Sequence, residues 1–564
     1  MSNLVKQAKL QVAQIVSAAL AKAMADGALP EAPLPDFAVE IPADTAHGDF
    51  ACNAAMVGAR TFKRAPRQIA DAIVAAADLS GTFFDRCEVA GPGFLNFFLN
   101  GSWFSQSVLA VRQEGDHYGR SDMGQGQKAM VEFVSANPTG PMHLGNARGG
   151  ALGDCLASVL DWAGYQVTRE FYINDAGNQI EKFGKSLAAR YLQIYKGEEN
   201  VEFPEDGYQG EDIKQRAREY ADLYGDKLVD CTPEERSHAL VDYALPLNIQ
   251  KLKDDLAKYR IHYDVWFKES VLHQNGSVQK IVDLMKERGL TYEKEGAIWY
   301  KATEYGAEKD DVLVRANGVP TYFTADIAYH YNKFAERGFD WVVNVWGADH
   351  HGHVARLKGA MDAVGLDGSK LDVVLMQMVR LMRGGEVARM SKRTGKAISL
   401  VDLLDEIPVD AARFFFNQRE PNTHCEFDLD LAIKNSSENP VYYVQYAHAR
   451  ICSILKALSA EGVTAESCTP EQLALLSTEQ ERALIRHLAG LTDCIEQSAK
   501  ALDPSKMTKY CLETATLFHK FYNACRVKGE AHDLLQARLN LCLATKQVLA
   551  NVLRMLGITA PESM

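Results

Sequence analysis

Short apolar runs alternate with longer amphipathic segments between residues 129 and 379, and this alternation limits the possible folds more than any other feature of the chain. Apolar runs bounded by polar or glycine-rich turns are typical of buried strands, and the segments between them have helical spacing. Strands that alternate with helices form a parallel sheet with crossover connections. The predicted strands are residues 129–134, 166–173, 341–346 and 373–379.

The two ends of the chain follow other patterns. Residues 1–120 combine a helical start with strand-like and turn-rich stretches, which predicts a separate α+β unit. From about residue 402 strand signals vanish and helices follow one another, one of them starting at a capping box of Ser477 and Gln480. We therefore predict a multidomain protein with an α+β unit at 1–120, an α/β domain at 121–402 that carries a helical insertion at about 190–265, and an all-α bundle at 403–564.

Composition excludes several classes of protein. A chain of 564 residues is too long for one hydrophobic core, and its apolar runs are too short to cross a bilayer. The N-terminus alternates charged and apolar residues, unlike a secretory signal, so we expect a cytoplasmic protein with no membrane role. Eleven cysteines without a C-x-x-C pair suggest neither a zinc knuckle nor a disulfide framework. The net charge of −13 argues against unspecific adhesion to nucleic acid, so any RNA contact must use local basic patches.

The segment at residues 132–146, EFVSANPTGPMHLGN, leaves a predicted strand, turns through Pro and Gly, and enters a helix. Ligands of doubly wound folds bind at such turns, outside the carboxyl ends of the strands. The helix N-terminus offers free N–H groups to phosphate, His143 adds a donor, and Gly145 lets a nucleotide approach the backbone. Taken alone, a single H-x-G on a loop is more often a turn with a surface histidine.

A basic loop at residues 388–396, ARMSKRTGK, follows the last predicted strand. Adenylyl transfer needs cations that stabilise the charge developing on pyrophosphate, and a short flexible loop can supply them. Taken alone, such a run is more often a solvated surface.

Together the two loops resemble the signatures of class I aminoacyl-tRNA synthetases. His143 to Asn146 is similar to H-I-G-H, with Asn146 in the last position, and Arg389 to Arg393 is similar to K-M-S-K-S, with Lys392 as the second lysine. The arginyl branch of the family is resembled by residues 132–146, 172–179, 322–326, 346–353 and 426–450. The resemblance implies a Rossmann-like class I catalytic domain at 121–402, an additional tRNA-binding domain at 1–120 and a helical anticodon-binding domain at 403–564.

This resemblance implies an arginine–tRNA ligase that acts in two steps. ATP activates L-arginine to arginyl-adenylate, and the arginyl group then passes to the 3′ end of tRNA(Arg). The implied cofactor is ATP with Mg²⁺, no protein-bound zinc is expected, and activation is expected to need bound tRNA. The expected partners are therefore L-arginine, ATP and tRNA(Arg), and we expect a monomer.

The resemblance also assigns site residues. Glu132 and Asn137 map to the α-amino and carboxylate end of arginine, whereas Tyr322 and Asp326 map to the guanidinium, a planar cation that needs carboxylate acceptors. The residues implied to bind arginine are Glu132, Ser135, Asn137, Tyr322, Asp326 and Asp349. Those implied to bind ATP are His143, Gly145, Asn146, His353, Met390, Ser391 and Lys392. The implied catalytic residues are His143, Asn146 and Lys392.

Two further motifs leave alternatives open. One motif could be a zinc site, because it combines suitable ligands in Asp349, His350, His351 and His353. Adjacent histidines on a strand point to opposite faces and cannot easily share one ion, so the role implied by the family resemblance is preferred. The resemblance implies tRNA contacts by Tyr446, Arg450 and Met555, although an aromatic stripe on a helix is more often core than RNA platform. Rival functions are another class I ligase, of cysteinyl or glutamyl type, and a non-catalytic RNA-binding paralogue.

Overall fold

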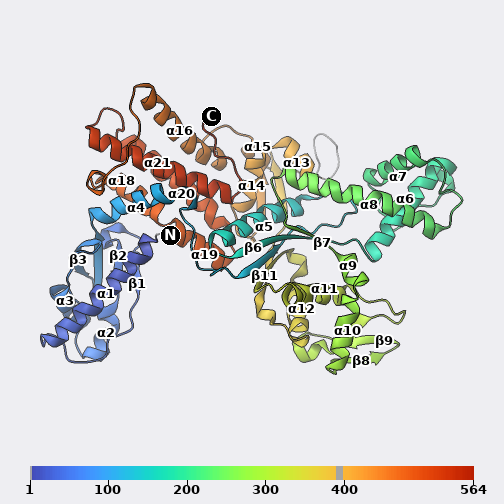
Figure 1. Ribbon diagram of the computed structural model, residues 1–564, viewed down its shortest axis with the longest axis horizontal. Helices are drawn as coiled ribbons and strands as arrows, with labels where there is room; N and C mark the ends of the chain where they lie inside the picture. The colour runs from blue at the N-terminus through green and yellow to red at the C-terminus, as the bar shows by residue number, and fades with distance from the viewer. Residues whose placement is uncertain (1–2, 389–397) are drawn as a thin grey trace.

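The computed structural model describes residues 3–388 and 398–564, which form an N-terminal α+β unit, a central parallel sheet and a C-terminal helical region (Figure 1). This arrangement confirms the fold class predicted from the sequence. The sheet lies at the centre of the molecule, and the first and last regions of the chain lie together on one side of it. Within the described residues, none of the helices has the combination of length and apolar character that crossing a bilayer requires.

The N-terminal unit is a four-stranded antiparallel sheet in the order β1-β2-β4-β3, covered by helices. The helix α1 buries Val12, Val16 and Leu20 at helical spacing, which explains why this amphipathic segment packs on the unit. The elements are α1 (Leu4–Ala25), β1 (Val39–Glu40), β2 (Phe50–Cys52), α2 (Ala54–Phe62), α3 (Pro66–Ala76), β3 (Phe84–Ala90), β4 (Phe94–Leu99) and the connecting helix α4 (Gly101–Glu114).

The central sheet has five parallel strands in the order β12-β11-β5-β6-β7. The chain winds outward from β5 to β7 and then returns to the other side of β5, so the topological switch lies between β5 and β11. Ligands of open α/β sheets bind at this switch, outside the carboxyl ends of the strands. The strands and the first crossover helix are β5 (Lys128–Glu132), α5 (Leu144–Trp162), β6 (Gln166–Ile173), β7 (Val265–Lys268), β11 (Trp341–Gly347) and β12 (Leu371–Met376).

Two units interrupt the sheet. The first is helical and projects away from the sheet (Figure 1): α6 (Asn178–Lys196), α7 (Glu211–Tyr224) and α8 (Pro233–Lys258). The second was not predicted and contains a small antiparallel sheet in the order β10-β9-β8. Its elements, with the crossover helix α12, are α9 (Glu269–Gln274), α10 (Ser277–Glu287), β8 (Thr291–Lys294), β9 (Ala297–Tyr300), β10 (Asp311–Val314), α11 (Tyr322–Tyr331), the π-helix η5 (Asn332–Glu336) and α12 (His351–Ala363).

The C-terminal region is helical but not entirely so. The prediction that strands end by residue 402 was wrong, because β15 pairs in parallel with β13, about 45 residues earlier in the chain. The predicted capping box was also one residue off: Thr478 caps the helix, and its partner Glu481 is buried against Arg538. The elements are β13 (Val379–Arg383), β14 (Glu386–Val387), α13 (Leu400–Glu406), α14 (Val409–Asn417), β15 (Cys425–Asp428), α15 (Leu429–Ala432), α16 (Pro440–Ala460), α17 (Pro470–Leu473), α18 (Glu479–Ala489), α19 (Leu491–Ala501), α20 (Ser505–Ala524) and α21 (His532–Met555).

Arg413, a fully buried cation on α14, joins the C-terminal turn to the central domain. Its guanidinium donates to the carbonyl of Leu556 at 2.7 Å and to that of Tyr259 at 3.0 Å, and it pairs with Asp154 of α5. Gly557 follows with φ +66°, and an added Cβ would lie 2.3 Å from the guanidinium, so only glycine fits this turn. The end of the chain is thereby fixed to the helix that begins at His143.

Candidate active site

The strand β5 ends at Glu132 and the chain turns sharply. Val134 and Ser135 have φ of 67° and 40°, and the left-handed region is strained for a β-branched residue such as valine. Ser135 holds the turn, because its Oγ donates to Glu132 Oε1 at 2.9 Å and accepts from the Tyr172 N–H at 3.1 Å. Such strain persists only where surrounding contacts support it, and it concentrates at functional sites.

His143 caps the N-terminus of α5 through a reciprocal pair of bonds with the residues after it. Its Nδ1 accepts from the Gly145 N–H at 3.1 Å, and Asn146 Oδ1 accepts from the His143 N–H at 3.0 Å. Asn146, the departure from the class I signature, is therefore the second half of a capping box. Desolvation lowers the pKa of His143. Because Nδ1 is an acceptor, the ring proton lies on Nε2 and can be donated to a ligand.

The absence of a side chain at Gly145 leaves room for the ring of His143. A Cβ at this position would lie 2.9 Å from Cε1 of the His143 ring. The ring therefore lies against the first turn of α5, beside the N–H groups that a phosphate would use.

The chain after the basic loop returns to this turn. His143 forms an isolated antiparallel bridge with Ser399, and the Leu400 N–H donates to the carbonyl of Met142 at 2.9 Å. Met390, Ser391 and Lys392 lie outside the described residues. Ser399 and Leu400 are nevertheless held beside the predicted nucleotide turn.

Asp326, on α11, lies between two histidines. His353 Nε2 is 2.5 Å from Oδ2, and His330 Nδ1 is 3.2 Å from Oδ1. Burial by itself would raise the pKa of Asp326, but the hydrogen bonds and charges of both histidines outweigh it and hold the pKa below its usual value. Tyr322, one turn earlier on α11, is 46% exposed and free to meet a ligand.

A chain of buried polar groups connects Glu132 to Asp326. Lys333 Nζ lies 2.5 Å from Glu132 Oε2 and donates to Asn344 Oδ1 at 3.2 Å. Asn344 Nδ2 then meets His330 Nε2 at 3.0 Å, and this bond leaves the ring proton of His330 on Nδ1, facing Asp326. The two carboxylates thus belong to one site at the switch between β5 and β11.

Lys333 and Asn344 were missed by the sequence analysis. The available signal was a single polar residue in an otherwise apolar strand, as with Asn344 in WVVNVWG. Buried polar side chains are hydrogen-bonded almost without exception, so such a residue implies polar neighbours.

The remaining predicted residues lie nearer the surface. Asn137 is exposed in the turn after β5. The side chain of Asp349, just beyond β11, is 82% exposed, with His350 Nε2 3.7 Å from its Oδ2. His353 instead contacts Asp326 and Arg356. Over residues 3–388 and 398–564, no three or more His, Cys, Asp or Glu side chains are arranged to hold a metal ion.

Comparisons with known families agree with this geometry. Three family models match the chain in order: the arginyl tRNA synthetase N terminal domain over residues 10–99, the class I (R) tRNA synthetase catalytic domain over 107–452 and the DALR anticodon binding domain over 444–564. The chain belongs to the arginyl-tRNA synthetase family. The arginine–tRNA ligases of Ruminiclostridium cellulolyticum and Caldanaerobacter subterraneus subsp. tengcongensis are 55% and 56% identical to this synthetase over 564 residues, with 100% of both chains covered in each case.

Solved structures agree on the fold. The arginyl-tRNA synthetase of Thermus thermophilus has a TM-score of 0.72 and 23% identity to this synthetase, and the match covers 97% of this chain and 99% of that one. The predicted family, the class I fold and the arginine–tRNA ligase function are therefore confirmed.

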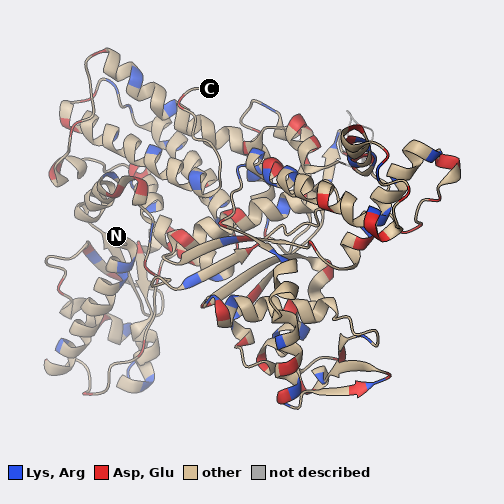
Figure 2. Cartoon of the chain, turned by 45° about the vertical axis from the view of Figure 1, so that its right-hand side comes forward, with Lys and Arg blue, Asp and Glu red and all other residues tan. Residues whose placement is uncertain are grey.

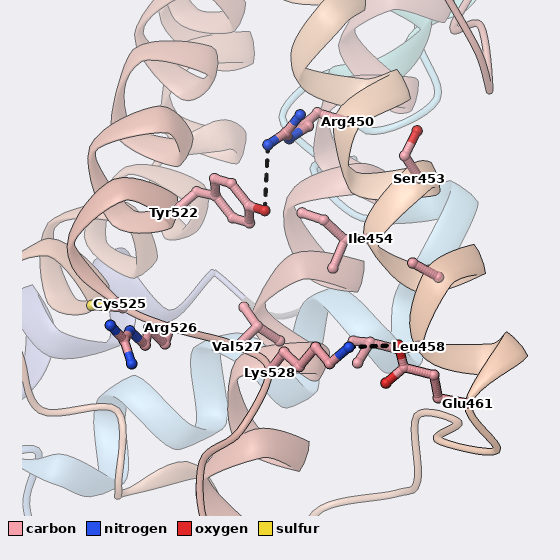
Figure 3. A pocket seen from close by; sticks show the side chains of 11 residues that line it. Arg450, Ser453, Ile454, Leu458, Glu461, Tyr522, Cys525, Arg526, Val527 and Lys528 are labelled. Atoms are coloured by element: carbon pink, nitrogen blue, oxygen red, sulfur yellow. Dashed lines mark hydrogen bonds and ion pairs between the residues drawn. The ribbon is translucent and has the colours of Figure 1, made fainter.

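The helical domain of the synthetase has a groove between α16 and the end of α20 (Figure 3). Its volume is about 470 Å³, with an apolar floor that includes Ile454 and Val527. Arg450 lies on its edge, with its guanidinium 5.0 Å from the centre of the Tyr522 ring and 3.5 Å from the hydroxyl of Tyr446. Met555, by contrast, is only 1% exposed and packs in the domain core, so its side chain offers no surface to RNA.

Basic and acidic residues of the synthetase are interspersed over each region (Figure 2). With an overall charge of −13, contact with RNA must rely on local basic groups and not on a general positive surface.

Proposed function

We propose that this synthetase binds L-arginine at the carboxyl edge of the central sheet, between Glu132 of β5 and Asp326 of α11. The connection of these two carboxylates through buried hydrogen bonds is the observation that carries the proposal. In this proposal Asp326 accepts from the guanidinium, beside Tyr322. Glu132, Ser135 and Asn137 face the α-amino and carboxylate end, and the exposed Asp349 borders the pocket.

Selectivity against lysine follows from the donor count. A guanidinium presents paired N–H groups in a plane, whereas an ammonium is a compact charge that cannot satisfy both oxygens of a carboxylate in the same way. A buried acceptor left without its donor is penalised by several kcal/mol, so lysine is rejected.

ATP, taken as its Mg²⁺ complex, binds across the N-terminus of α5 in this proposal. The N–H groups of the first turn and the Nε2–H of His143 are placed to meet phosphate, and His353 lies close to the arginine side of the pocket. Gly145 and Asn146 maintain the turn. Lys392, with Met390 and Ser391, supplies the cation for the leaving pyrophosphate.

The reaction then has two steps. The carboxylate of arginine attacks the α-phosphorus of ATP, giving arginyl-adenylate and pyrophosphate. A hydroxyl of the terminal adenosine of tRNA(Arg) next attacks the activated carbonyl and releases AMP. Positioning and charge stabilisation provide the catalysis, since no residue forms a covalent intermediate in this scheme.

We propose that the tRNA contacts Arg450 at the edge of the groove and Tyr446 beside it. Residues 1–120 are proposed to contact a part of the tRNA other than the anticodon. Aromatic faces with adjacent cations suit stacking of unpaired bases and contact with phosphate. We further propose that the synthetase acts as a monomer in the cytoplasm, since both carboxylates of the pocket come from one chain.

Amino-acid-dependent exchange of pyrophosphate into ATP tests this function. The assay is run with arginine, lysine, cysteine and glutamate, each with and without tRNA(Arg). We expect exchange with arginine only, and only when tRNA is present. Exchange supported by another amino acid would reject the proposed pocket, and no exchange with any of the four would favour an RNA-binding paralogue.

A further inference from the structure

Three polar side chains lie in register across the buried centre of the sheet. Glu132 of β5 is paired with Asn344 of β11 on one side and with Glu170 of β6 on the other. Two carboxylates directly opposite each other on neighbouring strands repel, and both are almost completely buried, with exposures of 6% and 0%. The sheet therefore needs two buried cations at this place.

The π-helix η5 supplies them. It continues directly from α11, and its wider turn is defined by the bond from the Arg337 N–H to the carbonyl of Asn332. Lys333 meets Glu132, and Arg337, four residues later, meets Glu170. Single π-turns inside helices are uncommon and occur often at functional sites, which suggests that one of these contacts serves more than packing.

The two carboxylates differ in how much hydrogen-bonding capacity they leave for a ligand. Glu170 is completely enclosed and accepts three bonds, one from the Tyr329 hydroxyl at 2.6 Å and two from Arg337, which donates to both of its oxygens. From the described residues, Glu132 accepts bonds from Lys333 on Oε2 and from Ser135 on Oε1, and its strand ends there, at the edge of the proposed pocket. Glu132 therefore keeps acceptor capacity where a ligand can reach it, whereas Glu170 is closed off from a ligand.

Lys333 itself is completely buried. Its ammonium lies 2.5 Å from Glu132 and 4.1 Å from the centre of the Tyr329 ring. The other titratable groups near Glu132 are Tyr172, Tyr263 and Tyr329, each with its pKa raised chiefly by burial and therefore uncharged, and the Glu170–Arg337 pair. In the described part of the chain, Lys333 is the one cation in direct contact with Glu132.

We propose that Lys333 is a positioning residue for arginine, which fixes the Glu132 carboxylate in orientation and cancels its charge at the end of the pocket that receives the α-amino and carboxylate groups. This inference rests on the proposed pocket. Free arginine is zwitterionic at that end and cationic at the other. The neutral Glu132–Lys333 pair matches the zwitterionic end, and the negatively charged carboxylate of Asp326 matches the cationic guanidinium end.

The pairing also matters for the reaction. The carboxylate of arginine must approach the negatively charged phosphates of ATP, and an uncompensated Glu132 would add a further negative charge nearby. With Lys333 in place, Glu132 can accept from the α-amino group without repelling the attacking carboxylate.

The test is Lys333→Met, which keeps the approximate volume and removes the charge. Glu132 is then buried without its counterion. We expect the KM for arginine in the exchange assay to rise about 10-fold or more. The KM for ATP should change by less than about twofold.

Arg337→Met is the matched control. It removes the neighbouring ion pair from the same π-turn, so it should lower the thermal unfolding temperature while the KM for arginine stays as in the wild type. A second control, Glu132→Gln with Lys333→Met, removes both charges. Its arginine KM should match that of Glu132→Gln alone, because Lys333 is proposed to act only through Glu132. This pair of variants also carries the test if Lys333→Met alone does not fold.

A Lys333→Met chain whose KM values for arginine and ATP rise equally would overturn the inference and make Lys333 a structural residue like Arg337. A double variant whose arginine KM lies well above that of Glu132→Gln alone would overturn it too. Failure of the proposed function looks different, because the wild-type chain would then show no arginine-dependent exchange.

Discussion

The carboxyl edge of the central sheet and the groove of the helical domain use charge in opposite ways. At the sheet, Glu132, Lys333 and Asp326 are buried or half-buried, and each is paired with a protein group at 2.5 to 3.2 Å. At the groove, Arg450 lies at the surface over an aromatic ring, and its contacts with two tyrosine hydroxyls are 3.4 and 3.5 Å long.

This difference corresponds to two kinds of ligand. Buried, paired charges are already oriented, so a small ligand that fits them gains strong hydrogen bonds in a region of low dielectric. Exposed cations on aromatic faces are solvated and adaptable, which suits a large polyanion recognised by stacking and phosphate contact. Substitutions should therefore have large, ligand-specific effects at the sheet edge and smaller, salt-dependent effects at the groove.

The largest effect is expected from Lys392→Ala. Loss of one donor to developing charge lowers a rate by about 100- to 1000-fold, and this residue is proposed to act only on the leaving pyrophosphate. The exchange rate should fall by that factor, whereas the affinity for arginine, measured by equilibrium dialysis, should stay within about twofold of wild type. An unchanged rate would remove the basic loop from the mechanism.

Asp326→Asn should come next. Truncation of a buried, hydrogen-bonded charge partner costs about 2 kcal/mol or more, which corresponds to about a 30-fold higher KM for arginine. The KM for ATP should be nearly unchanged, because ATP is proposed to bind at α5. Equal losses for both substrates in the exchange assay would show that Asp326 is not specific to the arginine side of the pocket.

Arg450→Gln should weaken tRNA binding by about 10-fold and reduce its salt dependence by roughly one ion. Filter binding of tRNA(Arg) at several salt concentrations measures both quantities. The matched control is Lys456→Gln, an exposed cation of the same helix that does not line the groove. If both variants lose affinity equally, the groove has no special role.

The smallest effect concerns acid stability of the helical domain. Burial lowers the pKa of His487 to about 4, and its Nε2 lies 3.0 Å from the carbonyl of Tyr510. The ring is neutral in the folded chain but gains a proton in the unfolded chain below about pH 6.5, so stability is lost as the pH falls from 6.5 toward 4.

His487→Gln keeps a donor that does not titrate. Its thermal unfolding temperature should drop less between pH 7 and pH 5 than that of the wild type, by roughly one to two degrees in this long chain. Calorimetry at both pH values measures the difference. The same drop in both proteins would place the acid-sensitive group elsewhere.

Much of the fold could be predicted because local patterns and tertiary structure agree. The apolar runs before Glu132 and after Trp341 are strands, and the polar turn at Pro138 to His143 separates a strand from a helix as its composition indicates. The family resemblance also named both carboxylates that the structure connects.

The features that the sequence did not predict depend on contacts between residues that are distant in the sequence. Lys333 follows a helix with no local sign of a π-turn, and only the register of Glu132 against Glu170 explains why a lysine is buried there. Strand β15 exists because β13 offers it a partner. The capping box was misplaced because Ser477 and Thr478 both suit a cap, and the choice depends on Glu481 meeting Arg538 of α21.

The bonds of Arg413 have a consequence for proteolytic stability. This residue bonds the carbonyl of Leu556 and also Asp154 of the helix that His143 begins. Cleavage before Leu556 would leave this guanidinium buried without one of its acceptors. The helix that carries the nucleotide turn would then lose support, so a cut far from the pocket should weaken the pocket as well.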